Sequence, residues 1–117
     1  MLASAKRDME ARDYASANNR AYYAIFHAIR AVLALDGEDF KKHSAVIARF
    51  TLNYSKTEIL PREYSKLISN ASLIRNRSDY EDLYICSVAD TNALFSGAVT
   101  FCGDVGEYLE QWYRTEL

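Results

Sequence analysis

Helix-breaking residues are scarce in this sequence, and that scarcity restricts the possible folds more than any other feature. Only one proline and four glycines occur among 117 residues. A β-sandwich or barrel needs many tight turns, which proline and glycine usually provide. Half of the residues are apolar and 26% are charged, proportions that are ordinary for a globular protein and exclude a disordered chain. The sequence therefore predicts one domain, residues 1–117, built from long helices.

Short links separate the predicted helices, which span about 1–12, 15–35, 44–54, 61–77 and 87–112, with a loop over 78–86. Gly37 can adopt the left-handed conformation that ends a helix, and Pro61 suits a first helical turn because its missing N–H needs no partner there. Ser87 precedes Asp90 by three residues, which is the spacing of a capping box at a helix start. Four substantial helices with short links favour an antiparallel bundle.

The predicted helix 15–35 has three distinct faces. One is a wide apolar arc formed by Tyr22, Ile25, Phe26, Ile29, Val32 and Leu33. The second is a seam of small side chains, Ala21, Ala24, Ala28 and Ala31. Such a seam allows close approach by another helix, either in the same chain or in a second subunit, and the sequence leaves both options open.

The third face of this helix is polar and carries Arg20, Tyr23, His27 and Arg30. These residues are neighbours by the three-and-four spacing of a helix. Two interpretations remain: a solvated or salt-bridged face that holds the bundle together, or part of a substrate-binding site.

A second group of charged residues covers 75–82, where the fourth predicted helix ends. Arg75 and Arg77 offer forked donors that match phosphate oxygens. Alternatively, the acidic residues Asp79, Glu81 and Asp82 neutralise these arginines, and a helix C-terminus favours cations in any case. The spacing alone does not decide between anion binding and a purely structural role.

Charge and cysteine content give further expectations. The net charge of −2 provides no overall basic field, so any contact with nucleic acid must come from a local patch. The start of the chain lacks an apolar leader segment, and no stretch approaches the roughly 18 apolar residues that span a bilayer. We therefore expect a cytoplasmic protein without membrane contact, with Cys86 and Cys102 reduced, and without a metal site or cofactor.

Three blocks of this sequence resemble the small stand-alone HEPN proteins of bacteria and archaea. They are Asn19-Arg20-Ala21-Tyr22-Tyr23-Ala24-Ile25-Phe26-His27, then Lys42-His43-Ser44, then Arg75-Asn76-x-x-Asp79-Tyr80. Their order and separations match, and the resemblance covers nearly the whole chain. It implies an all-α, up-and-down four-helix bundle, here with a short extra helix, that forms homodimers with a cleft between the paired subunits.

The resemblance also implies an activity. Many HEPN proteins are metal-independent ribonucleases, including toxins of toxin–antitoxin pairs and nucleases of defence systems. Their motif is an arginine, a polar residue and a histidine four to six positions after the arginine. Arg75 and Asn76 match the first two positions, whereas Tyr80 stands where the histidine is expected. Tyrosine, with a pKa near 10, is a poor base at neutral pH, so Tyr80 would orient a phosphate, donate a proton or stack on a base.

On this resemblance the candidate catalytic residues are Arg75, Asn76 and Tyr80, and the candidate substrate-binding residues are Arg20, Tyr23, His27, Arg77 and Asp79. His27 could reach the cleft and replace the missing imidazole. The first hypothesis is thus an RNA-binding or RNA-cleaving dimer.

Two other hypotheses remain. The chain could be a non-catalytic partner of a minimal nucleotidyltransferase, or a nucleotide-binding module, with an adenylyl group on Tyr80 or Tyr84. It could also use these residues for structure alone, with Asp79 paired to Arg20 or Arg75 and Tyr80 capping a neighbouring helix.

Overall fold

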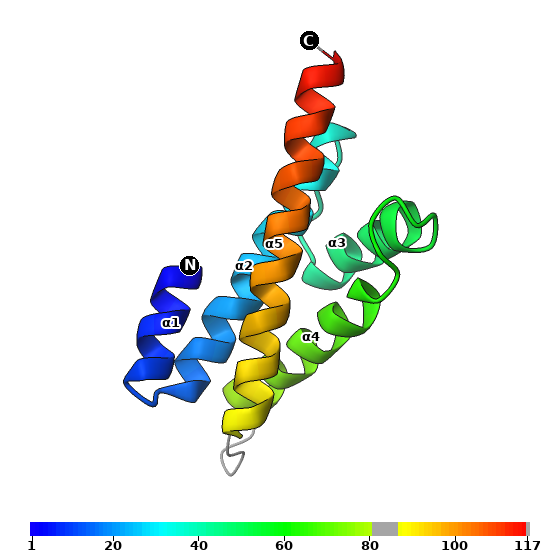
Figure 1. Cartoon of the computed structure of the whole chain (residues 1–117). Helices are drawn as coiled ribbons and strands as arrows, with labels where there is room; N and C mark the ends of the chain where they lie inside the picture. The colour runs from blue at the N-terminus through cyan, green and yellow to red at the C-terminus, as the bar shows by residue number, and fades with distance from the viewer. Residues whose placement is uncertain (81–86, 117) are drawn as a thin grey trace.

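The computed structural model is all-α in the part of the chain that it describes, namely the backbone of residues 1–80 and 87–116 and the side chains of residues 1–77 and 87–115. Its elements are α1 (Leu2–Glu10), α2 (Tyr14–Leu35), α3 (His43–Phe50), the π-helical η1 (Thr51–Ser55), α4 (Tyr64–Tyr80) and α5 (Val88–Glu116). Figure 1 shows that α1 and α4 run opposite to α2 and α5, while α3 and η1 link α2 to α4. The expected up-and-down bundle with a short extra helix is confirmed.

Helix α2 is the centre of the bundle because it packs against α1, α3, α4 and α5. Every residue of its predicted apolar arc is buried. At Ala24 the alanine seam packs against α5 of the same chain. There the thiol of Cys102 donates to the Ala24 carbonyl oxygen at 3.7 Å. Ala21 is buried as well, whereas Ala31 is exposed. The first half of the seam therefore allows close packing of helices within one chain.

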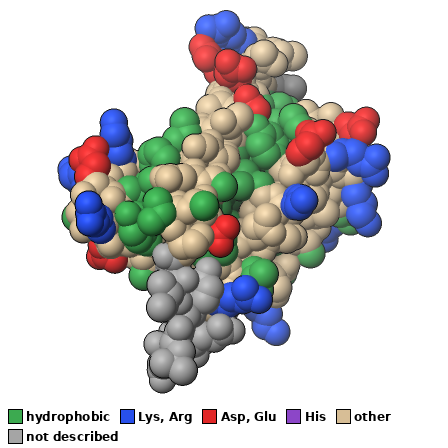
Figure 2. All heavy atoms as spheres, turned by 60° about the horizontal axis from the view of Figure 1, so that its bottom comes forward, with side chains coloured by type: hydrophobic (Ala, Val, Ile, Leu, Met, Phe, Trp, Pro, Cys, Tyr) green, Lys and Arg blue, Asp and Glu red, His purple; other side chains and the backbone are tan. Residues whose placement is uncertain are grey.

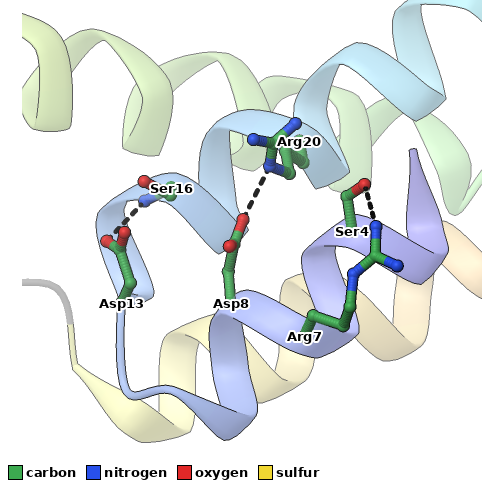
Figure 3. A network of polar contacts seen from close by, with 6 residues as sticks. All are labelled: Ser4, Arg7, Asp8, Asp13, Ser16 and Arg20. Carbon is green, nitrogen blue, oxygen red and sulfur yellow. Dashed lines mark hydrogen bonds and ion pairs between the residues drawn. The ribbon is translucent and has the colours of Figure 1, made fainter.

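Single residues set the ends of α1 and α2. Gly37 has a φ of +71°, the left-handed conformation expected after α2. Asp13 caps the start of α2, since its carboxylate accepts from the backbone N–H of Ser16 at 3.2 Å (Figure 3). Hydrogen bonds from the Ser16 side chain and then from this N–H lower the pKa of Asp13. Arg12, just before it, has a φ of 61°, so the first helix ends before residue 12.

Other boundaries differ from the predicted ones. Pro61 does not open α4: the N–H groups of Tyr64 and Ser65 donate to the carbonyls of Pro61 and Arg62 in a turn, and the α-helix begins at Tyr64. The helix predicted over 44–54 is α-helical only to Phe50 and continues as η1. The predicted loop begins at residue 78, but α4 continues to Tyr80. Residues 78–80 include no glycine or proline that would end the helix earlier.

None of the helices in the described ranges is both long and apolar enough to cross a bilayer. On the face shown in Figure 2, acidic and basic side chains are interspersed, mostly around the edges, and apolar side chains gather between them. That face therefore lacks a continuous basic field, in agreement with the net charge.

Ser87→Ala should lower the free energy of unfolding by about 1 kcal/mol, the usual cost of losing a helix N-cap. The Ser87 Oγ accepts from the backbone N–H of Asp90 at 2.9 Å, as the capping spacing predicts. Urea denaturation followed by circular dichroism measures the loss. Ser87→Asp keeps an acceptor at the same position and serves as the control, so equal stability of the two variants would contradict the role of the cap.

Candidate functional site

The candidate site forms around Arg75, which α4 holds against α2. Its Nη2 donates to the Tyr23 Oη at 3.0 Å. Its Cζ lies 5.0 Å from the ring centroid of Tyr22 and 5.3 Å from that of Tyr23. A guanidinium over aromatic faces is held by cation–π attraction as well as by hydrogen bonds. The half-buried Arg75 is therefore fixed beside the two consecutive tyrosines of the first HEPN-like block.

His43, the first residue of α3, lies beside the same tyrosine pair. Its Nδ1 is 2.9 Å from the Tyr22 Oη, and its ring stacks on Phe26 with a centroid distance of 4.0 Å. Burial, followed by the positive charges of Arg75 and Arg30, lowers the pKa of His43 below its ordinary value. The neutral imidazole is thus the favoured form at pH 7. Burial also raises the pKa of Tyr22, so its phenol keeps its proton.

These side chains line an open pocket of about 570 Å³ between α2, α3 and α4. The lining residues are Tyr22, His43, Ser44, Ile47, Ala48, Ser69, Ser72, Arg75 and Asn76. The pocket thus combines a permanent cation, a neutral imidazole, several hydroxyl groups and the exposed amide of Asn76. Such a set can bind an anion such as a phosphate group and exchange a proton with a molecule bound there.

The structure separates other predicted site residues from this pocket. Arg20 pairs with Asp8 of α1, with Nε and Oδ2 2.6 Å apart (Figure 3). Arg77 lines a different cavity, between α4 and α5, together with Leu73 and Asp90. His27 is exposed, with its ring centroid 6.1 Å from that of Tyr23. The residues that do come together are Arg75, Asn76 and Tyr23.

Sequence reasoning did not place His43 in the site. The signal was present in the Lys42-His43-Ser44 block, but nothing in the sequence spacing connects it to Arg75. The side chains of Asp79 and Tyr80, and all of Tyr84 and Cys86, lie outside the described residues, so the roles assigned to them stay predictions. Cys102 is a free thiol, half-buried against α2.

The HEPN domain family model matches residues 1–107. This chain belongs to the HEPN family. The HEPN chain is 38% identical over 68 residues to a "UPF0332 protein" of Thermotoga maritima, a match that covers 58% of the chain and 52% of the relative. It is 35% identical over 79 residues to "Putative toxin MJ0605" of Methanocaldococcus jannaschii, covering 68% of the chain and 59% of the relative. The matches thus span little more than half the length of these relatives.

No solved structure shows a significant match to the HEPN chain. Family membership confirms the resemblance drawn from the three sequence blocks. Within the described residues, no three His, Cys, Asp or Glu side chains gather as metal ligands would. Independence from metal, the homodimer and a nucleotidyltransferase partner stay predictions.

Proposed function

We propose that this HEPN chain is a ribonuclease module of toxin type, which acts as a homodimer and cleaves RNA without a metal ion. The position of Arg75 in the pocket carries the proposal. Family membership supports it, as does the similarity to a relative that bears the name of a toxin. Because the net charge is only −2, binding of RNA requires a local cationic site. The pocket lined by Arg75 provides such a cation.

The chemistry follows from the residue types. Arginine stays protonated at any physiological pH, and its planar fork matches two oxygens of a phosphodiester. In the proposed reaction Arg75 binds the scissile phosphate and stabilises the charge that grows on its oxygens as the 2′-hydroxyl attacks. Asn76 holds the substrate at the pocket rim, and Tyr80 acts near the scissile bond. In the homodimer the two Arg75 pockets face one cleft.

The decisive measurement compares RNA with DNA of the same sequence, both end-labelled, in the presence of EDTA. We expect the RNA to be cut to products with 2′,3′-cyclic phosphate ends and the DNA to stay intact, because attack requires the 2′-hydroxyl. Protein carrying Arg75→Ala and purified in the same way controls for contaminating nucleases. Failure to cut a varied set of RNAs would contradict the ribonuclease, and a monomeric mass in light scattering would contradict the homodimer.

A further inference from the structure

We infer that His43 is the proton acceptor for the 2′-hydroxyl in this reaction and supplies the imidazole that the Arg75 motif lacks. This inference rests on the proposed ribonuclease function and assigns a residue that the motif does not contain. It arises from the packing of α3 and of α4 against α2, which places an imidazole and a guanidinium in the wall of one pocket.

Tyr22 contacts both His43 and Arg75. Its Oη lies 2.9 Å from the Nδ1 of His43, and the guanidinium of Arg75 lies over its ring. Phe26 fixes the plane of the imidazole, since the two rings are inclined by only 25°. A phosphate held by Arg75 therefore lies in the same pocket as an imidazole whose position is set by two aromatic neighbours.

We assign the proton of the neutral imidazole to Nδ1, the nitrogen that is hydrogen-bonded to Tyr22. When the Nδ1 of His43 carries the proton and donates it to the Tyr22 Oη, the lone pair of the imidazole is on Nε2. Tyr22 is then a positioning residue: it accepts from Nδ1 and holds the ring in place, whereas Nε2 of His43 contacts the substrate.

Burial is the largest cause that lowers the pKa of His43, followed by the charges of Arg75, Arg30 and His27. Several charged and titratable groups face its ring. From α2 these are Tyr22, Tyr23, His27 and Arg30, and from α4 Arg75. Arg30 is itself paired with Asp39, so its effect on His43 is partly offset. A neutral imidazole with a pKa somewhat below the ordinary value of about 6.5 is ready to accept a proton at pH 7.

In the reaction, Nε2 of His43 takes the proton of the 2′-hydroxyl, and the 2′-oxygen forms a bond to phosphorus. The bond between phosphorus and the 5′-oxygen breaks, and the departing oxygen takes a proton from a water molecule. The products are a 2′,3′-cyclic phosphate and a 5′-hydroxyl end. His43 then returns its proton to the hydroxide that remains, which restores the starting state.

His27, the other histidine of the chain, is the natural rival, and the two can be compared directly. His27 is exposed on α2 and does not line the pocket, whereas His43 does. His43→Gln should lower kcat for RNA cleavage by about 10²–10⁴-fold, the usual contribution of general acid–base catalysis, while RNA affinity changes little. His27→Gln should not remove the pH dependence described next.

The pH profile separates catalysis from structure. In the wild type, the cleavage rate should rise as the pH increases through the lowered pKa of His43 and then level off, because only the neutral imidazole accepts a proton. His43→Gln should lack this acid limb. A second variant, His43→Ala, should regain cleavage when free imidazole is added, which a protein that has lost its fold would not do; circular dichroism checks the fold of both.

The outcomes are distinguishable. If the wild type and Arg75→Ala are equally inert, both the ribonuclease and the role of His43 are wrong. If the wild type cleaves RNA and Arg75→Ala does not, while His43→Gln keeps the acid limb or His27→Gln removes it, the role of His43 alone is overturned. Loss of the limb in His43→Gln together with imidazole rescue of His43→Ala supports it.

Discussion

RNA cleavage should fall by about 10²–10³-fold in the Arg75→Lys protein, although the side chain keeps its positive charge, and to background in Arg75→Ala. Lysine carries a compact charge without the planar fork, so it cannot hold two phosphate oxygens while bonding to the Tyr23 Oη and covering the rings of Tyr22 and Tyr23. Single-turnover cleavage of a labelled RNA with saturating protein measures the loss.

Arg114→Ala is the matched control for these variants. Arg114 lies near the C-terminal end of α5. Its side chain is 75% exposed and pairs with Glu110 of the same helix. Its replacement removes one positive charge from the chain without touching the pocket, so cleavage should be unchanged. Equal losses in Arg114→Ala and Arg75→Ala, each of which removes one positive charge, would mean that overall charge matters and the pocket does not.

The same variants test the hypothesis that Arg75 has a structural role only. In that case Arg75→Ala would unfold at lower urea concentration, and any loss of cleavage would follow the unfolded fraction. In the described part of the chain Arg20 pairs with Asp8, and the pairing of Asp79 with Arg20 or Arg75 stays a prediction. A folded but inactive Arg75→Ala protein would exclude a purely structural role.

The bundle could be predicted from the sequence because its signals are local and repeated. The apolar arc from Tyr22 to Leu33 recurs with the helical period, and each of its residues is buried. Helix ends were less predictable, because they depend on single hydrogen bonds. The turn at Pro61 and the π-helical hydrogen bond from the Lys56 N–H to the Thr51 carbonyl at 2.9 Å are examples.

The site was only partly predictable, because it is assembled by packing between helices. Arg75 and Asn76 were found through a motif that lies within one helix. His43 and Arg75 line the same pocket only because α3 and α4 both pack against α2. Sequence reasoning also assigned residues to one site that lie apart. Helical spacing put Arg20 and His27 on one face of α2, but a rise of 1.5 Å per residue places them about 10 Å apart along the helix.

Phe101→Ala should destabilise the protein by about 3–5 kcal/mol, the usual cost of removing a buried phenyl ring. Phe101 on α5 is fully buried, and its ring centroid lies 5.9 Å from that of Phe50 and 4.8 Å from that of Tyr64. Phe50 ends α3 and Tyr64 begins α4, and Tyr64 also donates to the carboxylate of Asp104 on α5. One side chain therefore holds both helices that supply His43 and Arg75.

The matched control is Phe95→Ala, which removes the same ring from a half-buried position on the same helix and should cost clearly less. Urea denaturation gives the two free energies of unfolding, and RNA cleavage is followed over the same urea range. In Phe101→Ala, cleavage should disappear at the lower urea concentration at which the folded fraction falls, although Phe101 does not line the pocket. Equal stabilities of the two variants would show that Phe101 does not hold α3 and α4 together. Other core contacts would then have to place His43 and Arg75 in one pocket.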